Sequence, residues 1–418
     1  MPKNIFYAQS GGVTAVINAT ACGVIEAARQ HSDDIGTVFA GHNGILGALK
    51  EQLIDTSHET DVAIATLKHT PGGAFGSCRY KLNCLEQNKA EYERIIEVFK
   101  AHDIGYFFYN GGNDSQDTTH KMAIMSERMG YPLTCIGIPK TVDNDLLMTD
   151  NCPGFGSVAK YIATSIREGA LDVASMAATS TQVFIMEVMG RNAGWIAASG
   201  GLACEQEGDA PHIILFPEVV YDEAKVFAKV TQSIERYGHC AIVVSEGLTN
   251  KNGDPIVESA KKDAFGHHQL GGTGHVIANA ITRNLGYKCH FAVCDYLQRS
   301  ARHLASQTDV DQAYALGQAA VEHAIAGTHG VMLTVERTNQ TPYAWQVGTA
   351  PLSDVANGVK HMPMEFISED GLGITQACRE YMLPLIQGEA FPPFKNGMPA
   401  YQQDLILQKR PQKLNALP

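Results

Sequence analysis

Short apolar runs alternate with longer amphipathic stretches along the first part of the chain. Apolar runs at residues 5–8, 104–109 and 133–138 predict strands, while residues 15–29 and a stretch ending near residue 128 have helical spacing. Strands that alternate with helices in this way are typical of a parallel sheet with helices on both faces.

The same pattern starts again after Gly154. The sequence predicts a long helix at residues 157–176 and further strands at residues 183–188, 212–216, 240–244, 291–294 and 330–335. From about Thr349 the chain is richer in proline and loses this alternation. We therefore interpret residues 349–418 as a C-terminal extension that packs on the body of the protein.

Glycine-rich or polar residues follow several of the predicted strands. The pairs at residues 11–12 and 111–112 and the segment at residues 189–191 each stand between a strand and a helix. Backbone N–H groups at a helix N-terminus can hold phosphate oxygens, and glycine allows close approach. A tight turn chosen for packing explains each pair equally well when it is taken alone. Ligands of open α/β sheets bind at the carboxyl ends of strands, so we expect these segments to converge on one site.

The segment at residues 139–145 follows a predicted strand and holds two carboxylates, one amine and one hydroxyl. A solvated loop can have this composition. At a strand tip between two possible phosphate sites, however, one carboxylate can accept the proton of an attacking hydroxyl while its neighbour supports Mg²⁺. The segment is therefore a candidate centre for phosphoryl transfer.

Composition narrows the class of protein. The chain has 418 residues, 44% of them hydrophobic, which is enough for two domains, and its formal net charge is −12. No basic stripe is visible, so nucleic acid is not an expected partner. The ten cysteines form no CxxC pair, which favours reduced thiols. No signal peptide or membrane span is visible, so we expect a cytoplasmic enzyme.

Seven motifs, in the same order, resemble those of the phosphofructokinase family across roughly residues 3–350. They are Gln9-Ser10-Gly11-Gly12, Gly72-Gly73 with Gly76-Ser77-Cys78-Arg79, residues 111–115, residues 139–145, Met189-Gly190-Arg191, Ser245-Glu246-Gly247 and residues 296–299. The resemblance implies two Rossmann-like, three-layer α/β domains with mainly parallel sheets and the active site in the cleft between them.

The resemblance also implies how the chain divides. Residues 1–154, together with about 298–348, are expected to form a discontinuous donor-binding domain. Residues 155–297 are expected to bind the sugar phosphate, and residues 349–418 form the extension. Family habit implies a homodimer or homotetramer.

The catalytic roles are likewise implied by the resemblance. Asp143 matches the family's general base, Asp145 supports the metal and the charge arrangement, and Thr141 orients the sugar or the phosphoryl group in transit. A turn-capping hydroxyl is an equally good interpretation of Thr141. Arg79 matches an arginine that contacts the moving phosphoryl group, which suits the planar fork of a guanidinium.

On the sugar-phosphate side, the resemblance implies binding by Met189, Gly190, Arg191, Glu246, Tyr296 and Arg299. The carboxylate of Glu246 is expected to bind sugar hydroxyls, and the arginines are expected to bind the existing 6-phosphate. Arg302 lies three residues beyond Arg299 and can face the same anion on one helical turn. A solvated helix face is nevertheless the favoured interpretation for Arg302 and for His303.

Two positions predict the phosphoryl donor. Relatives that use ATP carry glycine where this chain has Asp114 and Lys140, whereas the pyrophosphate-using branch carries aspartate and lysine. A carboxylate at position 114 fills the space of the α-phosphate and ribose and repels that phosphate. Lys140 neutralises a donor of two phosphates. With Gly11 and Gly12, these residues form the expected pyrophosphate site.

The chain departs from the common family pattern at three positions. Asn113 stands where many members have a magnesium-binding aspartate, so its neutral carbonyl is the expected metal ligand, with Asp114 or Asp143 able to compensate. Gln182 and His290 stand about where bacterial ATP enzymes bring two arginines from a neighbouring subunit. Arg302 or another basic group is a candidate to replace them.

These observations predict a Mg²⁺-dependent enzyme that transfers a phosphoryl group reversibly from pyrophosphate to fructose 6-phosphate in glycolysis or gluconeogenesis. Three alternatives are an ATP-dependent member of the family, a catalytically silent sugar-phosphate sensor, and a non-enzymatic sugar-binding protein. Asp114 and Lys140 argue against the first, and retention of Asp143 argues against the other two. Activity on sedoheptulose 7-phosphate and the physiological direction stay open.

Overall fold

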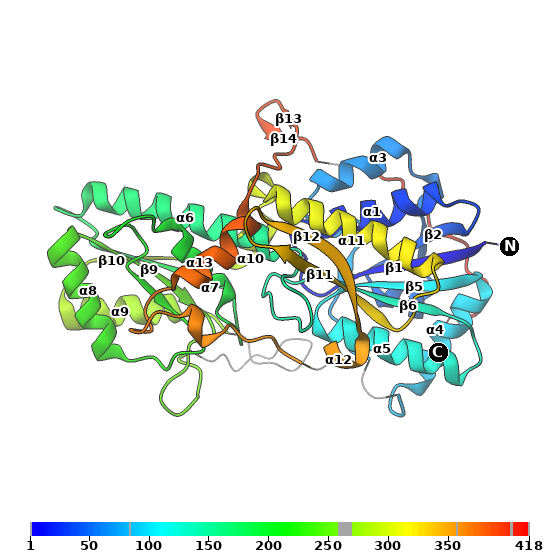
Figure 1. Ribbon diagram of the computed structural model, residues 1–418, viewed down its shortest axis with the longest axis horizontal. Helices are drawn as coiled ribbons and strands as arrows, with labels where there is room; N and C mark the ends of the chain where they lie inside the picture. The colour runs from blue at the N-terminus through cyan, green and yellow to red at the C-terminus, as the bar shows by residue number, and fades with distance from the viewer. Residues whose placement is uncertain (1, 83–84, 258–269, 357, 402–403, 417–418) are drawn as a thin grey trace.

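The computed structural model describes residues 2–82, 85–257, 270–356, 358–401 and 404–416. Two sheets form the two lobes of an elongated molecule (Figure 1). The larger sheet has the order β12–β11–β6–β5–β1–β2–β3, with β4 beside β1, and the smaller sheet has the order β10–β7–β9–β8. This arrangement confirms the predicted α/β architecture.

The strands of the larger sheet are mainly parallel. Only β3 and β12, at its two edges, run antiparallel to their neighbours. The strands are β1 (Lys3–Ser10), β2 (Ile35–Gly41), β3 (Leu53–Asp55), β4 (Ser77–Cys78), β5 (Ile104–Gly111), β6 (Thr134–Pro139), β11 (Val331–Asn339) and β12 (Ala344–Pro351).

Alternation along β1 shows why helices cover both faces of the larger sheet. Ile5 and Tyr7 pack in a cluster with α1 and α11, whereas Phe6 and Ala8 pack in the opposite cluster with α4 and α5. Successive strand side chains point to opposite faces, so an apolar run without polar interruption needs a covered sheet on both sides. The helices are α1 (Ile17–Gln30), α11 (Gln307–Ile325), α4 (Lys89–Ala101) and α5 (Asn113–Arg128).

The smaller sheet is wholly parallel and is covered in the same way. Its strands are β7 (Val183–Val188), β8 (Ile213–Leu215), β9 (Cys240–Ser245) and β10 (Cys289–Val293). The helices α6 (Phe155–Met176) and α7 (Trp195–Ser199) cover one face, and α8 (Glu223–Tyr237) and α9 (Thr273–Leu285) cover the other.

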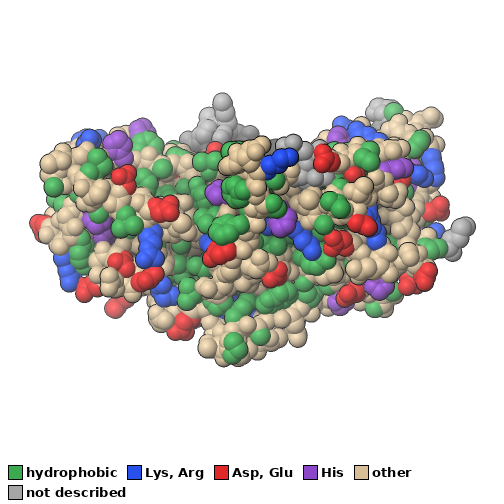
Figure 2. Space-filling view, turned by 90° about the horizontal axis from the view of Figure 1, so that it is seen from above, with side chains coloured by type: hydrophobic (Ala, Val, Ile, Leu, Met, Phe, Trp, Pro, Cys, Tyr) green, Lys and Arg blue, Asp and Glu red, His purple; other side chains and the backbone are tan. Residues whose placement is uncertain are grey.

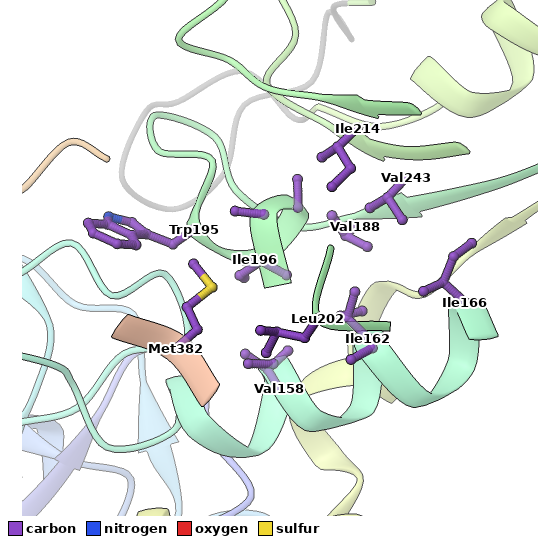
Figure 3. Packing of buried hydrophobic residues seen from close by; sticks show 14 of the residues in the cluster. Val158, Ile162, Ile166, Val188, Trp195, Ile196, Leu202, Ile214, Val243 and Met382 are labelled. Atoms are coloured by element: carbon purple, nitrogen blue, oxygen red, sulfur yellow. The ribbon is translucent and has the colours of Figure 1, made fainter. Parts of the chain in front are cut away.

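The C-terminal extension contacts both lobes. After α12 (Leu352–Val355), which packs on α5, the chain crosses to the smaller lobe and forms α13 (Gln376–Met382). Met382 joins the buried cluster of Trp195 and Leu202 there (Figure 3). The chain then projects as the hairpin β13 (Phe394–Lys395) and β14 (Met398–Pro399) before it returns to the larger lobe, where Lys409 pairs with Ile54.

Glu51 anchors the end of the chain to the larger lobe. Its buried carboxylate accepts hydrogen bonds from the backbone N–H groups of Lys413 (2.6 Å) and Leu414 (3.1 Å) and lies 2.7 Å from His102 Nε2. Burial alone would raise the pKa of Glu51, but these donors outweigh it and lower the pKa below the ordinary 4.5. The carboxylate therefore stabilises the fold in its ionised form.

We expect Glu51→Gln to lower the free energy of unfolding by about 1–3 kcal/mol at neutral pH, because a buried amide cannot satisfy three donors. The folded-state pKa is depressed, so the contribution is present above the ordinary glutamate pKa and is lost as the pH falls through the folded-state value. Urea unfolding of both proteins across this range tests the prediction. A difference that stays constant with pH would contradict it.

The described cysteines are free thiols and most are buried, as predicted, and Cys84 lies outside the described residues. Among the described helices, none combines the length and apolar character that a bilayer crossing requires. Acidic and basic side chains are interspersed on the face seen in Figure 2.

Candidate active site

A cleft of about 550 Å³ lies where strand ends of the two sheets meet. In the larger sheet, Ser10 of β1 pairs with Cys78 of β4, and Gly111 of β5 pairs with Pro139 of β6, so these strand ends are neighbours. In the smaller sheet, Val188 of β7 pairs with Ser245 of β9. Parallel strands thus bring residues that are distant in sequence to a common edge.

Most of the predicted site residues line this cleft. They are Gly11, Gly12, Arg79, Asn113, Asp114, Lys140, Thr141, Asp143, Asp145, Met189, Arg191, Glu246 and Arg299. Gly190 and Tyr296 are outside this lining. Gly190 follows β7 with φ of +128°, and its carbonyl accepts a hydrogen bond from the Ser245 hydroxyl (2.5 Å). The Tyr296 ring lies 3.9 Å from the Arg299 guanidinium carbon and is largely exposed.

Gly11 and Gly12 allow cations to lie against the end of β1. Gly11 has φ of +71°, a conformation that side chains rarely adopt. A Cβ atom on Gly12 would lie 2.3 Å from Arg299 Nη1 and 3.6 Å from Arg79 Nη2. A side chain at position 12 would therefore displace the Arg299 guanidinium from its observed place.

Lys140 is a buried amine that lines the cleft. Its Nζ donates a hydrogen bond to the Gly12 carbonyl (2.7 Å). Burial, with a smaller effect from the nearby Arg299, lowers the pKa of Lys140 to about 8, although Asp143 opposes the change. The amine is therefore mainly charged at neutral pH and loses its proton at mildly alkaline pH.

Asp143 follows Lys140 in the same loop and faces the cleft. Its backbone N–H donates to the Thr141 hydroxyl (3.1 Å), so Thr141 shapes the turn, as one of its two interpretations predicted. Removal from bulk water raises the pKa of Asp143, while Lys140, Thr141 and Arg299 counteract this shift. The carboxylate is thus a proton acceptor that cationic neighbours keep available.

Asp145 and Asn113 bring oxygen atoms together on the other side of Asp143. Asn113 Nδ2 donates to Asp145 Oδ2 (3.1 Å), and Asn113 Oδ1 is buried without a hydrogen-bond partner. Burial, and then the charge of Asp143, raises the pKa of Asp145 to about 7. An unpartnered buried oxygen beside two carboxylates suits a divalent cation. In the described residues, this cleft included, no group of three or more His, Cys, Asp or Glu side chains is arranged to hold a metal, so the candidate ligands here are two carboxylates and one amide oxygen.

Glu246 approaches the cleft from the smaller lobe. Burial raises the pKa of Glu246 to about 7, with a further rise from Asp143 and an opposing effect from Arg191. Its backbone N–H donates to the Val188 carbonyl (3.0 Å), which fixes the loop after β9 against β7. A carboxyl group and an arginine therefore line the cleft from the smaller lobe.

Asp114 stands in the first turn of α5, at the opening of the cleft. Its Oδ1 atom lies 2.8 Å from Lys81 Nζ, and this hydrogen-bonded pair raises the pKa of Lys81. Lys81 also lines the cleft, yet the motifs did not identify it. Lys81 lies in a segment that has neither helix nor strand periodicity, so its place in the cleft could not be predicted from the sequence.

The expectation for Arg302 was wrong. The helix α10 (Asp295–Ser300) ends before this residue, so the spacing from Arg299 does not place both on one helical face. Arg302 is 1% exposed and donates to the backbone carbonyls of Lys68 (3.0 Å from Nε) and Ala390 (2.5 Å from Nη1). It is neither an anion ligand nor a solvated side chain, whereas His303 is exposed.

The sequence and the fold are both similar to those of known proteins. The phosphofructokinase family profile matches residues 4–324. The chain is 64% identical to a pyrophosphate–fructose 6-phosphate 1-phosphotransferase of Halomonas elongata, over 95% of this chain and 94% of that protein. Crystal structures of pyrophosphate-dependent phosphofructokinases from Marinobacter aquaeolei (58% identity, TM-score 0.91, 99% of each chain) and Nitrosospira multiformis (57%, 0.92, 100% of each) are also similar.

Proposed function

The chain belongs to the phosphofructokinase family, and from this premise we propose that it transfers a phosphoryl group from pyrophosphate to the C1 hydroxyl of fructose 6-phosphate, giving fructose 1,6-bisphosphate and phosphate. The observation that carries the proposal is the position of Asp114 and Lys140 in one cleft with Asp143. Formation of fructose 1,6-bisphosphate by the purified protein with Mg²⁺ and pyrophosphate tests it. Absence of this product would overturn it.

Asp143 is the general base in this proposal. It accepts the proton of the C1 hydroxyl as that oxygen attacks phosphorus, and Lys140 and Arg299 favour its ionised form. Thr141 orients the reacting groups while its hydroxyl accepts the Asp143 N–H. Asp145 adds negative charge that balances a metal ion and the cationic donor site.

Pyrophosphate binds against the larger lobe. The N-terminus of α5 offers N–H groups in the same cleft as Gly11 and Gly12, whereas the Gly11 N–H already donates to the Cys78 carbonyl (2.9 Å). Lys140 supplies positive charge beside the Gly12 carbonyl. Arg79 contacts the phosphoryl group in transit. Asp114, held by Lys81, occupies the space that a third phosphate would need and repels its charge.

The residues also fit Mg²⁺. Asn113 Oδ1 and the carboxylates of Asp143 and Asp145 would hold the ion, and pyrophosphate oxygens would complete its shell. When bound, Mg²⁺ neutralises charge on the phosphates and orients them for transfer.

Fructose 6-phosphate binds between the lobes. Glu246 accepts hydrogen bonds from sugar hydroxyls, and Arg191 and Arg299 bind the 6-phosphate. Tyr296 supports the guanidinium of Arg299 through its ring. Met189 lines the cleft after β7, and Gly190 supports this position through the hydrogen bond that its carbonyl accepts from Ser245.

The pKa of Lys140 gives a pH prediction. A donor site that needs the ammonium should lose affinity as the pH rises through about 8, so kcat/KM for pyrophosphate should fall on the alkaline side. Lys140→Arg stays charged, and its alkaline limb should move to higher pH. Initial rates with limiting pyrophosphate measure both profiles. Identical alkaline limbs in the two proteins would contradict this role.

A pyrophosphate donor gives a reaction near equilibrium, so we propose a reversible step in glycolysis or gluconeogenesis. The division into a donor domain (1–154 with about 298–348), a sugar domain (155–297) and an extension (349–418) is part of the proposal. A cytoplasmic homodimer or homotetramer without nucleic acid as a partner stays a prediction.

A further inference from the structure

The C-terminal extension enters the cleft where no family motif predicts a functional segment. Gly358 and Val359 line the cleft, and the family profile ends at residue 324. We call residues 140–150, which follow β6, the catalytic loop. We call residues 358–363 the crossing segment, because they contact the catalytic loop of the larger lobe and the loop after β7 of the smaller lobe.

Lys360 connects the crossing segment to the catalytic loop. Its backbone N–H donates to the Asp145 carbonyl (2.7 Å). Its Nζ donates to the carbonyls of Thr149 (3.1 Å) and Asp150 (2.8 Å). Lys360 thus contacts the catalytic loop at Asp145 and again at Thr149 and Asp150.

The same residue contacts the smaller lobe. The Trp195 indole N–H donates to the Lys360 carbonyl (3.1 Å), and the Lys360 amine lies 5.4 Å from the Trp195 ring centre. The next residues continue the contact, since Met362 N–H donates to Glu218 (3.4 Å), which also accepts the Gly194 N–H (2.8 Å). Loop 192–195 carries residues that line the sugar side of the cleft.

Tyr381 is a second residue of the extension that contacts the loop carrying Asp143 and Asp145. Asn144, between them, has φ of +55° and is fully buried. Its Nδ2 donates to the Tyr381 hydroxyl (3.0 Å), which in turn donates to the Asp150 carbonyl (2.6 Å). The left-handed conformation is uncommon for a residue other than glycine, so such contacts determine it.

From these contacts we infer that Lys360 is a positioning residue for phosphoryl transfer: it fixes the catalytic loop, which carries Asp143 and Asp145, relative to residues 192–195 across the cleft. Tyr381 supports the same loop. Neither side chain is assigned a contact with the reacting atoms. The inference rests on the proposed function. Displacement of a catalytic group by about 1 Å can lower a rate about 100-fold, so loss of these contacts should slow phosphoryl transfer.

Lys360→Met keeps most of the side-chain length and removes the three ammonium donors. We expect kcat of the folded variant to fall about 10- to 100-fold, with KM for both substrates changed less than about threefold. Tyr381→Phe removes one hydroxyl and should lower kcat about threefold or more. Both side chains hold one loop, so the double variant should lose less activity than the product of the single losses.

Lys395→Met, at an exposed position in β13, is the matched control and should keep the parental kcat. Rates are measured well below the melting transition, which is recorded for each protein. A parent without pyrophosphate activity would overturn the proposed function. An active parent whose Lys360→Met and Tyr381→Phe variants lose melting temperature but keep kcat would overturn the positioning role alone. If Lys360→Met does not fold, the kcat of Tyr381→Phe decides the question.

Discussion

Replacing Asp143 by Asn should lower kcat for fructose 1,6-bisphosphate formation about 10³-fold. The amide has the size of the carboxylate but cannot accept the proton of the C1 hydroxyl, and positioned proton transfer typically contributes about 10²- to 10⁴-fold to a rate. Steady-state rates with saturating pyrophosphate, fructose 6-phosphate and Mg²⁺ measure the effect. The KM for fructose 6-phosphate should change little, because in the proposed complex Arg191 and Arg299, not Asp143, bind the phosphate end of the sugar.

Thr141→Ser is the control for this variant. It keeps the hydroxyl that accepts the Asp143 N–H, so kcat should stay within a few-fold of the parent. Calorimetric binding of fructose 6-phosphate shows whether Asp143→Asn still forms the sugar site. If Asp143→Asn binds the sugar normally and keeps more than about a tenth of the parental kcat, Asp143 is not the general base.

Replacing both Asp114 and Lys140 by Gly should lower kcat/KM for pyrophosphate about 100-fold and relax the discrimination against ATP. Loss of Lys140 removes a buried cation from the donor site, and truncation of one partner in a buried charge arrangement commonly costs this much. Loss of Asp114 frees the space of a third phosphate and removes its repulsion. Initial rates with each donor, at matched Mg²⁺, give the preference ratio.

The two single variants separate these effects. Lys140→Gly should mainly weaken pyrophosphate use, and Asp114→Gly should mainly improve ATP use while it releases Lys81 from its ion pair. Lys81→Ala then reports whether the released amine matters for pyrophosphate. A double variant with the parental preference ratio would mean that donor choice is determined elsewhere in the cleft.

The sequence predicted the parts of the site that lie directly after strands. Lys140 and Asp143 follow β6, and Gly11 and Gly12 follow β1, so parallel topology alone brings them together. The alternation of strands and helices was equally informative, because a buried parallel strand needs a continuous apolar run. Roles of individual residues came from family resemblance and stay proposals until variants are measured.

Contacts between distant irregular segments could not be predicted in this way. Lys81 pairs with Asp114 across an interval that has no repeating pattern. Lys360 reaches the catalytic loop over about 210 residues of sequence, and its own neighbours give no periodic signal. The prediction for Arg302 was wrong because the helix ends at Ser300. The spacing of Arg299 and Arg302 in the sequence does not show where a helix ends.

The most direct test offers pyrophosphate and ATP together to the purified parent protein, with Mg²⁺ and fructose 6-phosphate, and measures phosphate and ADP as products. We expect phosphate to accumulate in step with fructose 1,6-bisphosphate while ADP stays at background. Consumption of both donors at comparable rates would contradict the claim that this cleft selects a donor of two phosphates.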